Sequence, residues 1–206
     1  MIEVWGRTSS FNVQKVMWAL AELDLTCTRH EAGGKFGGLD ADNYGAMNPN
    51  RRIPVLKDGD AIVWESNAVV RYLAAKYGAG TLWADEPLER SLADRWMDWQ
   101  AVTLQMHLHP IFWGLVRTPP EQRNQAEIDA AVKAIQPLWL VLDQHLSGQR
   151  FVAGDQLTMG DIPVGCAYWR YINIDIERPA LPNCDLWFGQ LKARQGYRDN
   201  VMLPVV

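Results

Sequence analysis

The sequence has few cysteines and no long run of apolar residues. Its three cysteines, Cys27, Cys166 and Cys184, are far apart and form no Cys-x-x-Cys pair. A disulfide framework, a zinc site and a dithiol redox site therefore lack support. No stretch approaches the roughly 18 apolar residues of a transmembrane helix, and the N-terminus lacks the charged and then apolar pattern of a signal peptide. We therefore expect a cytoplasmic protein without a metal site or membrane association.

The sequence also has no excess of basic residues. Lysine and arginine together number 20 against 24 aspartates and glutamates, which gives a net charge of -4. Because binding through phosphates requires a basic face, we expect no nucleic acid partner. The chain of 206 residues, of which 48% are hydrophobic, is long enough to bury the core of one large domain or two modest ones.

The first 78 residues carry the pattern of a small α/β domain. Residues 2–5 and 25–30 are predicted strands, and an amphipathic helix that begins near Ser10 joins them. Asp58-Gly59-Asp60 between two apolar runs is a strong hairpin signal, and another helix begins at Ser66. This order of strands and helices, β-α-β, loop, β-β-α, is that of a thioredoxin-like domain.

No strand is predicted beyond a linker at residues 79–87. Helical periodicity dominates the rest of the chain, with breaks or kinks expected at Pro110 and Pro137 because proline lacks a backbone donor. The predicted fold class is therefore α/β plus all-α, with a thioredoxin-like domain at residues 1–78 and a helical-bundle domain at 88–206. The four predicted helices lie at 88–116, 121–146, 158–172 and 185–194.

Hydroxyl and amide side chains gather between Thr8 and Asn12, where the first strand meets the first helix. Free backbone N–H groups at a helix N-terminus favour an anion. Ser10 and Asn12 could equally cap the helix, and the local sequence leaves both alternatives open. No histidine or acid follows closely, so a hydroxyl that donates to an anion fits better than a serine nucleophile.

Three more motifs allow a structural and a functional interpretation. Pro54 begins a strand and could be an edge residue or a cis-proline, and trans is the commoner state. Glu65-Ser66-Asn67 precedes a helix, where Ser66 could be an N-cap or bind a carboxylate while Glu65 pairs with an ammonium group. Thr158-Met159-Gly160-Asp161 is a variant of the capping box and is interpreted as structural.

In this order and spacing, the motifs resemble those of cytosolic glutathione transferases, and specifically the bacterial theta- and Nu-like enzymes. The resemblance covers nearly the whole chain and implies the same two-domain fold. It is carried by Ser10-x-Asn12, Asn48-Pro49-x-x-Arg52-Ile53-Pro54-Val55-Leu56, Glu65-Ser66-Asn67-Ala68-Val69-Val70-Arg71-Tyr72-Leu73, Trp96-Met97-x-Trp99-Gln100 and Thr158-Met159-Gly160-Asp161-Ile162.

The resemblance implies roles for the matching residues. Ser10 matches the catalytic hydroxyl, and Asn12 matches an amide that shares or replaces its role in some bacterial members, while Ser9 is a competitor. Pro54 is implied to be cis, in contrast to the commoner trans state. The implied glutathione-binding residues are Lys35, Arg52, Ile53, Pro54, Glu65 and Ser66, and the second substrate is expected on Met106, Pro110, Trp113, Tyr168 and Tyr171.

The implied activity is that of an enzyme of detoxification, a glutathione S-transferase. It would activate the thiol of glutathione, its co-substrate, as a thiolate and conjugate it to small hydrophobic electrophiles. Glutathione-dependent peroxidase, disulfide-bond reductase and dehalogenase chemistry at the same site remain alternatives. From another class, a non-catalytic protein of this fold that binds ligands or partners is a further alternative.

The resemblance also implies a homodimer, whose interface we expect on the helix around Trp96 and Trp99. An acid from the partner subunit often meets the γ-glutamyl amine in this family, and Asp98 is a candidate for it. The sequence departs from the family at Arg51, where glycine usually precedes the basic residue.

Overall fold

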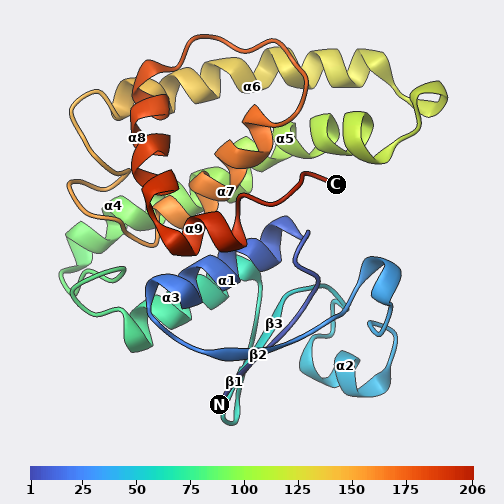
Figure 1. Cartoon of the computed structure of the whole chain (residues 1–206), viewed down its shortest axis with the longest axis vertical. Coiled ribbons are helices and arrows are strands. Elements are labelled where there is room, and N and C mark those ends of the chain that lie inside the picture. Colours follow the sequence, from blue (N-terminus) through green and yellow to red (C-terminus); the bar gives the residue numbers. More distant parts are fainter.

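The computed structural model describes residues 1–206 and shows a sheet domain below a larger helical domain (Figure 1). The sheet has the strand order β2-β1-β3-β4. β1 pairs with β2 in parallel and with β3 in antiparallel orientation, and β3 and β4 form the expected hairpin. The predicted fold class is confirmed. The strands are β1 (Ile2–Trp5), β2 (Cys27–His30), β3 (Val55–Asp58) and β4 (Ala61–Trp64).

Helices α1 (Phe11–Glu22) and α3 (Ser66–Tyr77) lie side by side between the sheet and the helical domain (Figure 1). Helix α2 (Asp42–Met47) packs through Tyr44 on Val55 and so lies against the other face of the sheet. The helical periodicity of α1 buries Val13, Val16 and Leu20. One apolar core runs from the strands through α1 into the helical domain. The two domains therefore share one core, with α1 at its centre.

The start of α1 lies very close to the end of β1. A Cβ atom at Gly6 would lie 2.4 Å from Val13 Cγ2, so only glycine permits this approach. Trp5 pairs with Val55 in the antiparallel register, which brings the residues after β1 and the residues before β3 to the same end of the sheet. This end of the sheet faces the helical domain (Figure 1).

The predicted long helix at 88–116 is observed with one difference. Pro110 lies inside α5 (Gln105–Phe112) without ending it, whereas the departures from α-helical geometry are the wider π-helical segments η2 (Trp99–Leu104) and η3 (Trp113–Arg117). Before them runs α4 (Pro87–Asp98). Pro110 removes a single donor, and the packing of the helix on its neighbours outweighs that loss.

The remaining helices differ from prediction mainly at their ends. α6 (Gln125–His145) continues through Pro137 without the predicted break. α7 (Asp161–Ile172) and α8 (Pro182–Ala193) follow, and a short last helix, α9 (Gln195–Asn200), was not predicted. None of the helices has the length and apolar character needed to cross a membrane.

Trp96 is buried in the helical domain, and Trp99 is partly buried beside it. The Trp96 ring packs edge-on against Trp99 with centroids 5.1 Å apart, and Trp99 packs in the same way on Trp139. The two rings themselves therefore offer little free apolar surface, and the dimer interface expected on this helix stays a prediction. The large apolar side chains that are exposed along this long helix are Leu88, Val102, Met106 and Trp113.

Asp161 is fully buried and joins three segments of the helical domain. Its Oδ1 accepts hydrogen bonds from the Val152 backbone and from Trp187 Nε1, and its Oδ2 accepts from the backbone and hydroxyl of Thr158. Burial raises the pKa of Asp161 to about 6, and the hydrogen bonds oppose the rise. Asp161 thus begins α7 and also links this helix to the segment before it and to α8.

We expect Asp161→Ala to lower the free energy of unfolding by about 3 kcal/mol or more, because each buried donor left unsatisfied costs about 1–3 kcal/mol. Urea denaturation measures the change. Asp155→Ala, at an exposed position in the segment before α7, should stay within about 0.5 kcal/mol of the wild type. A large loss of turnover at unchanged stability would contradict the structural role.

Lys15 is buried at the junction of the two domains with no carboxylate partner. Its ammonium group donates to Gln100 Oε1 at 2.9 Å and to Asn67 Oδ1 at 3.2 Å, and lies 4.4 Å from the centroid of the Phe11 ring. Burial lowers the pKa of Lys15 from its usual 10.5 to about 7. Desolvation therefore destabilises the charged form of Lys15 in the folded state.

We predict that Lys15 makes stability rise with pH between about 7 and 10.5, the interval between its folded and unfolded pKa values. In that interval the unfolded chain binds a proton that the folded chain lacks, and the slope approaches about 1.4 kcal/mol per pH unit. Denaturation curves at several pH values should show that Lys15→Met loses this rise. The exposed Lys133→Met is the control, and parallel curves for wild type and Lys15→Met would refute the prediction.

Candidate functional site

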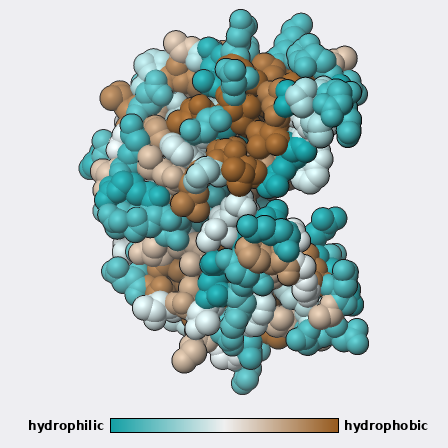
Figure 2. All heavy atoms as spheres, turned by 45° about the vertical axis from the view of Figure 1, so that its right-hand side comes forward, coloured by the Kyte–Doolittle hydropathy of each residue, from teal (hydrophilic) through white to brown (hydrophobic).

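Two adjoining cavities lie where the sheet domain meets the helical domain. Figure 2 shows an indentation between the two domains, with apolar atoms gathered on the helical domain above it and polar atoms on the sheet domain below. The α3 cavity, of about 460 Å³, is lined by Arg7, Asn12, Gly34, Leu39, Asn48, Arg52, Ile53, Pro54, Glu65, Ser66 and Trp113. The α1 cavity, of about 150 Å³, is lined by Arg7, Ser9, Ser10, Phe11, Asn12, Gln105, His109, Phe112, Trp113, Arg117 and Arg170.

The backbone before β3 is held in place at the wall of the α3 cavity. The Tyr44 hydroxyl and Asn48 Nδ2 both donate to the main-chain oxygen of Arg52, each at 2.8 Å. The Ile53–Pro54 peptide bond is cis, which confirms the state implied by the resemblance and corrects the trans expectation from frequency alone. The main chain at Ile53 is thereby presented along the cavity.

The start of α3 forms the opposite wall. Glu65 has a φ of 67°, in the left-handed region that is uncommon outside glycine and that often marks functional sites. Ser66 is buried, and its hydroxyl donates to Asn12 Oδ1 at 3.1 Å. With its oxygen occupied, the Asn12 amide keeps Nδ2 as a free donor.

Ser10 occupies the N-cap position of α1 but makes no side-chain capping bond. Its hydroxyl is therefore available at the α1 cavity, where Ser9 also lies. Asn12 differs from both serines because it lines both cavities. Among the three candidates, Asn12 is the one at the boundary where two ligands would meet.

The cations at the α3 cavity differ in part from those expected. Arg52 lines it, whereas Lys35 lies exposed over the Phe36 ring and is absent from the wall. Arg7 lines both cavities and was missed by sequence reasoning. The signal that could have found it is its place directly after Gly6 at the end of the first strand.

Arg51 supports the loop beside the α3 cavity without lining it. It has a φ of 51°, and its guanidinium donates to the main-chain oxygens of Leu39 and Ala41. A positive φ favours glycine, which agrees with the glycine that the resemblance implies at this position. Arg51 tolerates the left-handed conformation while fixing the loop through two hydrogen bonds.

The residues expected to bind the second substrate are dispersed. Trp113 lines both cavities, whereas Met106 and Pro110 lie in a separate groove between α5 and α6 that Trp113 also borders. Tyr168 and Tyr171 are buried in the helical domain. Tyr168 donates to Asp185, and Tyr171 stacks on Trp139, so the prediction for these two tyrosines is wrong.

Three arginines, which sequence reasoning did not select, line the α1 cavity instead. Arg7 comes from the loop after β1, Arg117 from η3 and Arg170 from α7. Burial lowers the pKa of Arg170 to about 10, and the positive charges of Arg117 and Arg7 also lower it. Arg170 stays charged at neutral pH, so this wall of the cavity is cationic.

The chain matches known proteins along its whole length. Residues 5–81 match the family model "Glutathione S-transferase, N-terminal domain" and residues 125–190 match "Glutathione S-transferase, C-terminal domain". Glutathione S-transferase GstB of Escherichia coli (strain K12) is 45% identical over 208 residues, which cover 100% of both chains. Glutathione S-transferase D6 of Drosophila melanogaster is 30% identical over 75% of this chain and 71% of its own.

A solved structure agrees with these relatives. The theta class glutathione S-transferase of Xanthomonas axonopodis pv. citri, determined with glutathione bound, superimposes with a TM-score of 0.96 at 42% identity. The superposition covers 100% of this chain and 99% of that one. The two domain models match this chain, and a relative at 45% identity matches its full length. The chain therefore belongs to the glutathione S-transferase family.

Proposed function

We propose that this glutathione S-transferase binds glutathione in the α3 cavity and joins its sulfur to an electrophile held in the α1 cavity. The observation that carries the proposal is the position of Asn12, which lines both cavities and is oriented by the hydroxyl of Ser66. A thiol bound at that boundary is within reach of a polar donor and open to a second ligand. Residues 1–78 then supply the glutathione site, 79–87 are the linker and 88–206 supply most of the electrophile wall.

The charged ends of glutathione match the polar groups of the α3 cavity. The backbone N–H groups at the start of α3, including that of Ser66, suit the γ-glutamyl carboxylate while the Ser66 hydroxyl remains bonded to Asn12, and Glu65 suits the ammonium group. The main chain of Ile53 pairs with the cysteinyl part. Arg52 and Arg7 line the cavity and are proposed for the glycine carboxylate in preference to the exposed Lys35.

The donors at the start of α1 are sufficient to stabilise a thiolate. An ordinary thiol has a pKa near 8.5, and lowering it by about two units requires about 2.7 kcal/mol in favour of the charged form. A hydrogen bond to a charged group contributes about 1.5–3 kcal/mol. The free Nδ2 of Asn12 supplies such a bond, and the Ser10 hydroxyl and the N-terminus of α1 supply further stabilisation.

We expect Asn12→Ala to raise the pKa of the enzyme-bound thiol by about one to two units, the worth of one charge-assisted hydrogen bond. Ser10→Ala should raise it by less, because Ser10 lines only the α1 cavity. Ser9→Ala is the control and should leave the pKa unchanged. Titration of thiolate absorbance against pH with each variant measures the effect.

A larger shift in Ser10→Ala than in Asn12→Ala would assign the activating role to Ser10. An unchanged thiol pKa in both variants would reject the proposed activation altogether. A panel of aryl halide, isothiocyanate, hydroperoxide and mixed disulfide then separates conjugation from peroxidase and reductase chemistry at the same site.

We further propose that the enzyme is a two-fold symmetric homodimer. Exposed apolar side chains lie on η2 and α5, at Val102 and Met106, and on α6, at Leu140 and Val141. Such side chains on neighbouring helices are typical of a surface that a second subunit covers.

Sedimentation at micromolar concentration should therefore give about twice the mass of one chain, and Val102→Asp should raise the fraction of monomer. Leu186→Asp, an equally exposed position on α8, is the matched control and should leave the mass unchanged. A wild-type monomer at this concentration would disprove the dimer.

A further inference from the structure

Arg170 is a buried cation without a partner in the protein. The residue is only 9% exposed, and its guanidinium carbon lies 4.0 Å from the centroid of the Phe112 ring and 4.9 Å from that of Phe11. It forms neither an ion pair with a carboxylate nor a hydrogen bond with another residue, while it lines the α1 cavity. Burying an unpaired charge costs desolvation free energy, so an anionic ligand that pairs with Arg170 would offset that cost.

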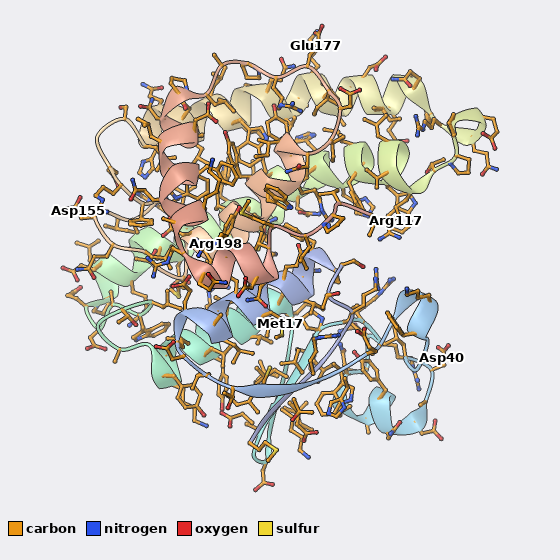
Figure 3. The ribbon with its side chains drawn as sticks, viewed as in Figure 1. Met17, Asp40, Arg117, Asp155, Glu177 and Arg198 are labelled. Carbon is orange, nitrogen blue, oxygen red and sulfur yellow. The ribbon has the colours of Figure 1, made fainter.

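No acidic side chain lies beside Arg170 in the α1 cavity. Arg7 and Arg117 line the same cavity, whose wall includes no aspartate or glutamate. Arg117 donates to an oxygen of Val206, the last residue of the sequence, and so already has a partner of its own, whereas Arg170 has none. Burial raises the pKa of the neighbouring Cys166 thiol to about 12, so that group is neutral. Figure 3 shows Arg117 at the edge of the helical domain that faces the sheet domain.

Glutathione does not explain these cations. Of the three arginines, only Arg7 also lines the α3 cavity, where Arg52, Glu65 and Ser66 match the charged ends of glutathione. Arg117 and Arg170 lie on the other side of Asn12, where the second substrate is proposed to bind. An anion beside them would therefore be carried by the electrophile.

We infer that the preferred electrophile is a small molecule that bears a carboxylate, which Arg170 binds in the α1 cavity with Arg117 beside it. This inference rests on the proposed function and adds a charged group to the expected hydrophobic substrate. Guanidinium groups bind carboxylates through two parallel hydrogen bonds, which fixes the orientation of the ligand. Phe11, Phe112 and Trp113 supply apolar contacts for the rest of the molecule.

Two matched aryl chlorides test the inference, 4-chloro-3-nitrobenzoate and the neutral 4-chloro-3-nitrobenzamide. In both reactions the glutathione sulfur bonds to the ring carbon and chloride leaves with its bonding pair, while the thiol proton goes to solvent. Each kcat/KM is divided by the uncatalysed rate constant of the same compound. We expect the wild type to favour the carboxylate by about 10-fold or more, as a charge-assisted pair provides.

Arg170→Met should lower the kcat/KM for the carboxylate far more than that for the amide, which brings the preference close to one, and it should leave the KM for glutathione unchanged because Arg170 does not line the α3 cavity. Arg170→Lys, which keeps the charge, should restore part of the preference. Arg117→Met should also lower the preference for the carboxylate, and it replaces Arg170→Met as the test variant if Arg170→Met folds poorly. Arg150→Met is the control, because Arg150 is exposed and lines a surface pocket together with Asp155. Figure 3 shows Asp155 on the opposite side of the molecule from Arg117.

The inference would be overturned if the wild type had the same normalised kcat/KM for the two compounds. It would also be overturned if Arg170→Met raised the KM for glutathione without changing the preference, since Arg170 would then bind glutathione.

Failure of the proposed function is recognised separately. In that case the wild type conjugates neither compound, nor 1-chloro-2,4-dinitrobenzene. Calorimetric titration with unreactive 3-nitrobenzoate and 3-nitrobenzamide, without glutathione, then tests the anion site alone. Binding of the carboxylate only, lost in Arg170→Met, supports the inference, and no binding at millimolar concentration rejects it.

Discussion

The hydrogen bond from Ser66 to Asn12 is the interaction on which the organisation of the site depends. It joins the starts of α1 and α3, two helices whose first turns are separated by more than 50 residues of chain. Ser66 is buried, and the left-handed conformation of Glu65 sets the direction in which α3 begins. The amide of Asn12 is therefore oriented by the same residues that would hold the γ-glutamyl end of glutathione. Binding and activation share one structural element.

Much of the fold was predictable because local physics determines it. The apolar periodicity of α1, the Asp58-Gly59-Asp60 turn and the start of α3 at Ser66 were all recognised correctly. The two interior prolines were misjudged, because a missing backbone donor is a local cost whereas the packing that offsets it is distant in sequence. Pro110 and Pro137 both remain within helices for this reason.

The site was predictable only where its residues belong to a local motif. Asn12, Pro54 and Ser66 lie in such motifs and the structure places them at the α3 cavity. Periodicity shows that Tyr168 lies on an apolar helix face, but it does not show whether that face meets a cavity or the core, and the core is the outcome. Arg170 has no motif at all, because its surroundings come from α1, α5 and η3.

The division of the wall between the two cavities has a consequence for how selectivity can change. Arg7, Asn12 and Trp113 border both cavities, so a substitution at any of them alters the setting of both substrates at once. Arg117 and Arg170 border the α1 cavity alone. Variation at these two positions can redirect the enzyme to another electrophile while the glutathione site is preserved, which makes one half of the active site adjustable and the other half constant.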